Sequence, residues 1–197
     1  MDRMDRTERT RKNAVLSLMG NVAYSAYHIT FGHLIRSWWL LTLGVYYLLL
    51  SVVRFAVLCL CKSDSAAIRF TGGMLMALTP PLAGTVVLSL VRDRGHRLHM
   101  IIRIAMAAYT FTRITLAAVQ LAQTRRGTSA TLAALRNISF ADAVVSIFSL
   151  QRSMLVSFEG MEEAEIRLMN ALLGLAVCAT VFWLGINLLQ KGKRNGL

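Results

Sequence analysis

Five of the charged residues inside the long apolar segments of this chain are the side chains best placed to do chemistry. Asp142 is the only acid among them, and the bases are Arg54, Arg113, Arg136 and Arg152. A charge inside a bilayer is costly unless it faces protein or water, so such residues commonly mark ion pairs, proton relays or substrate paths. An arginine near a helix end can instead extend to the membrane surface, whereas the short aspartate cannot. We therefore expect Asp142 to face an arginine across a helical bundle, with Arg113 as the first candidate.

Uncharged polar residues are spaced so that they share faces of three predicted helices. At about 100° per residue, five polar positions near Asp142 fall within about 80° of one another. This stripe consists of Ser139, Asp142, Ser146, Ser149 and Ser153. A second stripe contains Tyr109, Thr110, Arg113, Gln120 and Thr124, and a third contains Ser17, Asn21, Ser25, His28 and Gly32. The stripes fit either a hydrated bundle interior or ordinary hydrogen-bonded helix packing.

Two adjacent prolines, Pro80 and Pro81, lie near the middle of another apolar segment. Proline has no backbone N–H, so the pair is expected to break or kink this helix and to free carbonyl groups. A simple kink and a discontinuous helix that binds a ligand are the two alternatives.

Catalytic and metal-binding signatures are missing from the sequence. There is no HExxH, no GxSxG and no glycine-rich phosphate loop, and His96 and His99 form an isolated HxxH pair. His28 and His33 fall on different faces of a helix. The three cysteines lie in apolar runs, where they are expected to be packing residues. We expect no enzyme activity, no metal and no cofactor.

The elements that carry these residues are long apolar runs at 38–61, 70–91, 101–123, 132–158 and 167–190. At about 1.5 Å per residue each is long enough to cross the roughly 30 Å of a bilayer core. Hydrophobic residues make up 55% of the chain and charged residues 16%, and the mean hydropathy is +0.52. The expected fold is all-α, a polytopic transmembrane bundle of about six helices in which segment 14–35 is the marginal span.

The distribution of basic residues favours six crossings over five. With six, twelve bases fall on one side: Arg3, Arg6, Arg9, Arg11, Lys12, Lys62, Arg69, Arg125, Arg126, Lys191, Lys193 and Arg194. Five fall on the other: Arg36, Arg92, Arg94, Arg97 and Arg167. The positive-inside rule then places both termini in the cytoplasm, although loop 91–100 puts three arginines outside. We expect one integral membrane domain, with a helical bundle at 14–190 and basic tails at 1–13 and 191–197.

A short internal repeat predicts two inverted three-helix halves. Residues 22–31 align with 104–113, which superposes Ala26, Tyr27 and Thr30 on Ala108, Tyr109 and Thr112. Residues 51–54 align in the same way with 149–152. Because three is odd, the second half would run in the opposite direction, an arrangement common in transporters. The third helices of the two halves, 70–91 and 167–190, depart from the pattern, since only the first of them contains proline.

Much of the net charge of +12 is explained by membrane orientation, because terminal bases attract anionic headgroups. The expected partners are the lipid bilayer and either a second copy of the chain or another membrane protein. Nucleic acid is not expected, since the bases are spread over loops with no soluble domain to form a groove.

Three stretches resemble an uncharacterised family of small multi-spanning membrane proteins from Gram-positive, Clostridia-like bacteria. They are residues 37–55 (SWWLLT, YYL and RF), residues 136–153 (RNIS, ADA and SLQRS) and residues 169–172 (MNAL). The resemblance implies a bacterial plasma membrane and a single unit from about residue 21 to residue 188, but no activity. Two functions are therefore expected as alternatives: a small permease or transporter-like bundle, or a non-catalytic accessory subunit of a membrane complex.

Overall fold

The computed structural model is an all-helical bundle, and it describes residues 2–59, 64–91, 100–123, 130–155 and 162–194. These residues form six α-helices and no strand. In chain order they are α1 (Asp2–Leu34), α2 (Trp38–Cys59), α3 (Asp64–Val91), α4 (Met100–Gln123), α5 (Ala130–Leu155) and α6 (Glu163–Arg194). The prediction of an all-α bundle of about six helices is confirmed.

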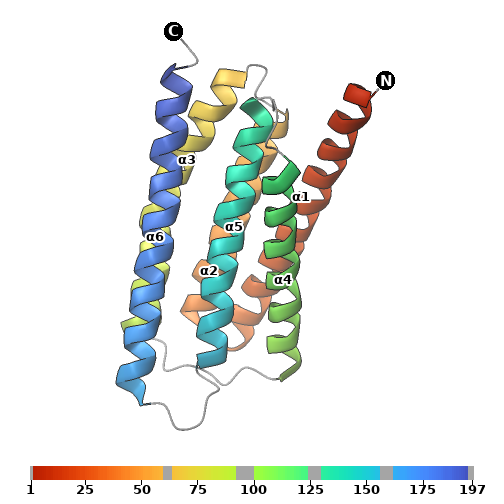
Figure 1. The fold of residues 1–197 in the computed structure, drawn as a ribbon. Coiled ribbons are helices and arrows are strands. Elements are labelled where there is room, and N and C mark those ends of the chain that lie inside the picture. Colours follow the sequence, from red (N-terminus) through yellow and green to blue (C-terminus); the bar gives the residue numbers. More distant parts are fainter. Residues whose placement is uncertain (1, 60–63, 92–99, 124–129, 156–161, 195–197) are drawn as a thin grey trace.

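The helices alternate in direction along the chain, so α1 begins and α6 ends at the same end of the bundle (Figure 1). α1 packs on α2, α4 packs on α5, and α3 packs along α6. α5 also contacts α2, α3 and α6, which makes it the central helix of the arrangement. Side chains that point inward from α5 therefore meet residues from most of the other helices.

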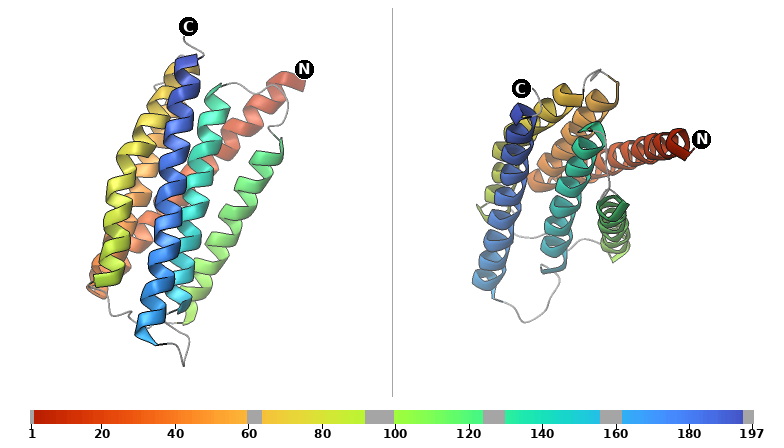
Figure 2. Two further views of the ribbon diagram at one scale, coloured as in Figure 1. Left: turned by 60° about the vertical axis from the view of Figure 1, so that its left-hand side comes forward. Right: turned by 45° about the horizontal axis from the view of Figure 1, so that its top comes forward.

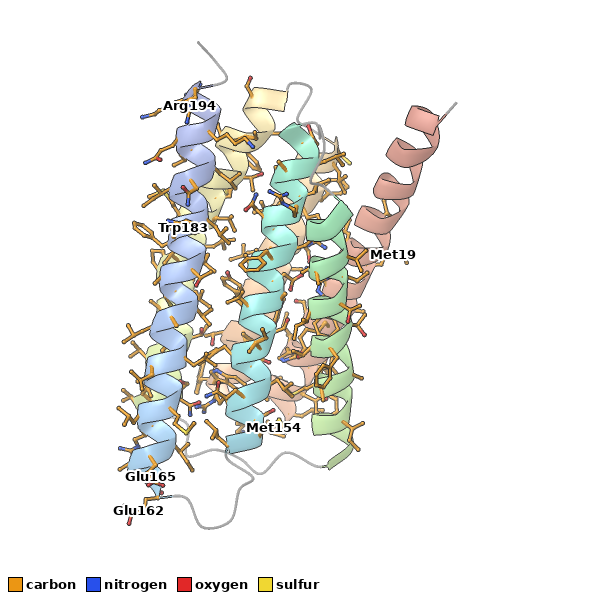
Figure 3. The ribbon with its side chains drawn as sticks, in the orientation of Figure 1. Met19, Met154, Glu162, Glu165, Trp183 and Arg194 are labelled. Carbon is orange, nitrogen blue, oxygen red and sulfur yellow. The ribbon has the colours of Figure 1, made fainter. Side chains whose placement is uncertain are left out.

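Four helices are long and apolar enough to cross a membrane, and they are α2, α3, α5 and α6. Large apolar side chains also point away from the bundle; Trp183 of α6, for example, is 63% exposed and faces outward in Figure 3. An exposed apolar surface of this kind is stable in contact with lipid. The chain is a membrane-embedded helical protein. In the part of the chain that the structure describes, α1 and α4 do not meet the same criterion.

The described parts of the two basic tails, residues 2–13 and 191–194, are helical and continue α1 and α6. α1 is helical from Asp2, and its 33 residues correspond to about 50 Å, more than a bilayer core needs. The surplus length lies at its N-terminal end, where α1 diverges from the other helices (Figure 2). α6 begins with Glu163 and Glu165 and ends with Lys191, Lys193 and Arg194, charges that complement the helix dipole at each end.

The turn between α1 and α2 is short and hydrogen-bonded. Arg36 has a φ of 53°, and the Ser37 N–H donates to the Gly32 carbonyl at 2.9 Å, as in a Schellman helix end. Beyond the turn the two helices approach closely. A Cβ on Gly44 would lie 2.7 Å from Ile29 Cγ1 and 3.0 Å from the Ile29 backbone nitrogen. Glycine is therefore needed at this position for α1 to pack against α2.

α3 continues through Pro80 and Pro81 as one α-helix. The discontinuous binding helix, with a break at these prolines, is therefore wrong, and the simple kink stays a prediction, because a kinked helix is still continuous. One reason why α3 stays continuous is support from the neighbouring helix, since α6 packs along α3 on both sides of the prolines. Gly185 contacts Met76, and Gly174 contacts Val86. Tertiary packing outweighs the helix-breaking tendency of proline in this segment.

The helix directions and pairings have the form that an inverted repeat requires. In Figure 1 each helix of the first half runs in the opposite direction to its counterpart in the second half: α1 to α4, α2 to α5 and α3 to α6. The packed pairs α1–α2 and α4–α5 correspond to each other. The central pairs α2–α5 and α3–α6 would lie across the relating axis. α3 also packs on α5, whereas α2 and α6 make at most a weak contact within the described residues, so the two halves are not packed identically.

Candidate functional site: a charged cluster beside the central helix

Three helices, α1, α2 and α4, bring a charged residue or an amide to the carboxylate of Asp142 on α5. Its Oδ2 atom accepts a hydrogen bond from Asn21 Nδ2 of α1 at 2.8 Å. Arg113 of α4 forms an ion pair with the same oxygen, and Arg54 Nη2 of α2 lies 3.7 Å from it. Asn21 and Asp142 are 0% exposed, Arg54 is 1% exposed and Arg113 is 5% exposed. We call Asn21, Arg54, Arg113 and Asp142 the charged cluster.

Neighbouring polar groups fix the orientation of the charged cluster. Tyr109 Oη donates to Asn21 Oδ1 at 2.8 Å, which directs the Asn21 amide group toward Asp142. Arg54 Nη2 donates to Ser139 Oγ at 3.0 Å, and the Arg113 guanidinium lies 5.6 Å from the centre of the Tyr109 ring. A buried charge is tolerated when it is held by hydrogen bonds of this kind.

One helical turn along α5, Ser146 links three helices. Its hydroxyl donates to the Asp142 carbonyl at 2.8 Å and lies 3.0 Å from Tyr47 Oη of α2. Since the serine proton is used on the carbonyl, the tyrosine is the donor of the second hydrogen bond. Thr110 Oγ1 of α4 donates to the Ser146 carbonyl at 3.3 Å. Hydrogen bonds therefore continue from the charged cluster along the buried face of α5.

Aromatic rings and His28 surround the next turn of this face. Tyr24 stacks on Tyr109 with ring centroids 3.5 Å apart, and the His28 ring lies 4.1 Å from the Tyr24 ring. His28 Nδ1 lies 3.0 Å from the Tyr24 carbonyl, which can only accept, so Nδ1 carries a proton. Among the described residues the buried Nε2 of His28 has no hydrogen-bond partner. Ser149 Oγ lies next to the Tyr24 hydroxyl, but the two do not reach hydrogen-bond geometry.

Arg152 occupies a separate position nearer the end of α5. It is buried, donates from Nη1 to the Ser89 carbonyl of α3 at 2.8 Å, and lies 4.6 Å from the centre of the Trp39 ring. Arg152 therefore packs between helices and does not lie on the outer surface of the bundle. Arg136 is half-buried and is not among the contacts of Asp142.

The predicted pair of Asp142 and Arg113 is present, and the cluster also contains Arg54 and Asn21 from the candidate residues. Ser146 and Ser149 lie on the same buried face, and His28 lies two turns from Asn21. The contacts that Tyr24 and Tyr47 make on this face were not predicted. The adjacent pair Tyr46 and Tyr47 in an apolar run could have indicated that a buried tyrosine hydroxyl needs a hydrogen-bond partner there. The side chains of Ser17, Gln120 and Thr124, together with His96 and His99, lie outside the described residues.

No metal centre is formed by the described residues, since none of their histidines, cysteines and acids gather in groups of three or more. The geometry defines a class: a helical membrane protein with a buried, hydrogen-bonded charged cluster at the centre of its bundle. Scans of known protein families, curated proteins and solved structures found no match to this chain. The resemblance to a bacterial family therefore stays a prediction.

Proposed function

We propose that this protein is a small permease-like bundle in which a polar path runs along α5. The observation that carries the proposal is the series Ser139, Asp142, Ser146, Ser149 and Ser153, all of which are buried inside the bundle. From Ser139 to Ser153 the series spans about 20 Å of helix. Intramembrane polar residues that face a bundle interior are typical of transport pathways. The expected setting is a bacterial plasma membrane with both termini in the cytoplasm.

The accessory-subunit alternative draws less support from the same residues. In that alternative the polar stripes would form an interface with another membrane protein, so they would lie on the outer surface of a single chain. Instead the stripe of α5 and the described part of the α1 stripe, Asn21, Ser25, His28 and Gly32, are buried within one chain. A partner protein would have to bind elsewhere.

Cysteine accessibility tests the polar path directly. The three native cysteines are replaced by serine, Ser146→Cys and Ser149→Cys are introduced singly, and intact cells are treated with a membrane-impermeant, charged thiol reagent. Ile147→Cys is the matched control, because Ile147 is next to Ser146 but is 38% exposed on the outer face of α5, where lipid excludes such reagents.

We expect Ser146→Cys and Ser149→Cys to react faster than Ile147→Cys, because a hydrated path would admit the reagent and allow the thiol to ionise. If both inward positions react no faster than the lipid-facing control, the proposal of a polar path is refuted. Persistent co-purification of a second membrane protein with an unlabelled interior would favour the accessory subunit.

A further inference from the structure

Four exposed bases gather at the end of the bundle where α3 begins and α6 ends (Figure 1). Arg69 comes from α3, and Lys191, Lys193 and Arg194 come from the last turn of α6. The two helices are in contact at this end, since a Cβ on Gly192 would lie 2.5 Å from Arg69 Cγ. The aliphatic part of Arg69 therefore lies against the α6 backbone. We call Arg69, Lys191, Lys193 and Arg194 the basic patch.

No acid pairs with the basic patch in the part of the chain that the structure describes. None of its four bases forms an ion pair there. Asp64 is the acid nearest to Arg69 in the sequence, and its side chain lies outside the described residues. The other end of α6 is different, because Arg167 lies 3.4 Å from the Glu163 carboxylate. The bases of the patch thus gather without a counter-charge from the described side chains, although like charges repel.

Helix stability does not explain the position of Arg69. The bases in the last turn of α6 complement the dipole of that helix. Arg69 instead lies in the second turn of α3, near the positive end of its dipole, where a base gains nothing from it. Neither the dipole nor a described acid accounts for Arg69 beside the bases of α6, whereas an anionic partner would.

The basic patch lies at the level of the lipid headgroups. α3 and α6 are long and apolar enough to span a membrane, and their 28 and 32 residues correspond to about 42 and 48 Å, so their end turns extend beyond a bilayer core of about 30 Å. Nearer the middle of the same helices, Met74 is 37% exposed and Trp183 is 63% exposed. Figure 3 shows Trp183 pointing outward, below Arg194 at the end of α6. The basic patch therefore continues into an apolar surface that acyl chains can contact.

We propose that the basic patch binds the headgroup of one anionic phospholipid between α3 and α6. The phosphate lies among the bases, and the acyl chains run along the exposed apolar side chains of the two helices. A lipid fits this position better than a soluble anion, because the bases lie at the ends of membrane helices. The site differs from the general attraction of basic tails to anionic membranes, since it requires Arg69 to lie against Gly192. It does not depend on the proposed permease function.

Native mass spectrometry of the full-length protein in neutral detergent tests this site, because it counts bound lipids and gives their dissociation constants. Phosphatidylglycerol is the probe, and phosphatidylcholine with the same acyl chains is the zwitterionic control. Arg69→Gln and Lys193→Gln each remove one base from the patch, and Arg69→Lys retains the charge. Arg167→Gln is the matched control, since it removes one exposed base from the other end of α6. Gly192→Ala changes no charge, but its Cβ would displace the Arg69 side chain.

We expect one phosphatidylglycerol molecule to bind the wild type more tightly than phosphatidylcholine does. Arg69→Gln and Lys193→Gln should each weaken phosphatidylglycerol binding about fivefold, the contribution of one base near an anionic headgroup. Arg69→Lys and Arg167→Gln should bind phosphatidylglycerol like the wild type. Gly192→Ala should weaken binding as Arg69→Gln does, a result that attraction by net charge alone does not predict.

The lipid site is overturned if Arg69→Gln binds phosphatidylglycerol as tightly as the wild type, or if Arg69→Gln and Arg167→Gln lose the same affinity. It is also overturned if folded Gly192→Ala keeps wild-type affinity. Glycerol phosphate carries the anionic group without acyl chains, so its displacing the lipid at equal concentration would identify a soluble anion instead. Thermal unfolding in lipid-free detergent shows whether each variant is folded. Should Gly192→Ala be unfolded, the comparison of Arg69→Gln with Arg167→Gln decides.

Discussion

Asp142 is the residue on which the centre of the bundle depends. Its carboxylate and its carbonyl receive contacts from α1, α2 and α4 and from Ser146 one turn further along α5. A buried charge network of this kind is costly to assemble, and removing one partner leaves the other charges in a low-dielectric interior. The contribution of Asp142 to stability is therefore better measured by removing it together with a partner than by removing it alone.

We predict that Asp142→Asn destabilises the detergent-solubilised protein by about 3–5 kcal/mol, because the buried Arg54 and Arg113 lose the negative charge that lies against both of them. The double change Asp142→Asn with Arg113→Gln should recover part of this loss. Thermal unfolding of the wild type, both single variants and the double variant gives the coupling free energy directly.

Arg152 provides the control for this double-mutant cycle of Asp142 and Arg113. It is buried on the same helix, nearly three turns from Asp142, and its contacts include the Ser89 carbonyl and the Trp39 ring. Arg152→Gln combined with Asp142→Asn should therefore show additive effects, within about 0.5 kcal/mol. If Asp142→Asn unfolds at the wild-type temperature, Asp142 is not a structural partner of the arginines.

At the scale of the helices, the α3–α6 pair depends on glycines that allow the backbones to approach each other. A Cβ on Gly72 would lie 2.9 Å from both the Gly185 carbonyl oxygen and the Leu189 nitrogen. A Cβ on the next residue, Gly73, would meet no atom within 4 Å. Small residues serve the same purpose at many contacts between membrane helices.

The two adjacent glycines allow a matched comparison. Gly72→Ala should destabilise the protein, because backbone atoms of α6 cannot move away as a flexible side chain would. Gly73→Ala should leave stability unchanged or raise it by up to about 1 kcal/mol, the difference in helix propensity between glycine and alanine. Thermal unfolding of both variants measures the difference. If the two variants unfold at the same temperature, α3 and α6 do not pack through Gly72.

Hydrophobic length and periodicity were sufficient to predict the helices, since the apolar runs of α2–α6 differ from the observed helices mainly at their ends. The same patterns predicted the inward face of α5 and the pair of Asp142 and Arg113, because a buried acid has few alternatives to an arginine. The choice between a continuous and a broken α3 could not be made from the sequence, because helix packing, not local propensity, decides how Pro80 and Pro81 are accommodated. The contacts of Arg152 could not be predicted either, since Ser89 and Trp39 are distant from it in sequence.

For the whole molecule, the direction of the helices is linked to the charge distribution. α1 begins and α6 ends at one end of the bundle (Figure 1), and Glu162 and Glu165 lie at the opposite end from Arg194 (Figure 3). Six crossings would therefore place the two basic termini in the same compartment. The position of α1 is decisive, because its hydropathy is marginal while Asn21, Ser25 and His28 are buried against the other helices.

We predict that fusions at the N-terminus and after Leu197 both report the cytoplasm, whereas an insertion at Glu162 reports the exterior. The physical reason is the positive-inside rule acting on the terminal bases. Paired reporters make the measurement: alkaline phosphatase is active only outside the inner membrane, and green fluorescent protein is fluorescent only inside. Termini in different compartments would contradict the six-crossing arrangement. In that case α1 would lie along the membrane surface, and Asn21 could not reach Asp142 at the centre of the bundle, so the same experiment also tests the geometry of the charged cluster.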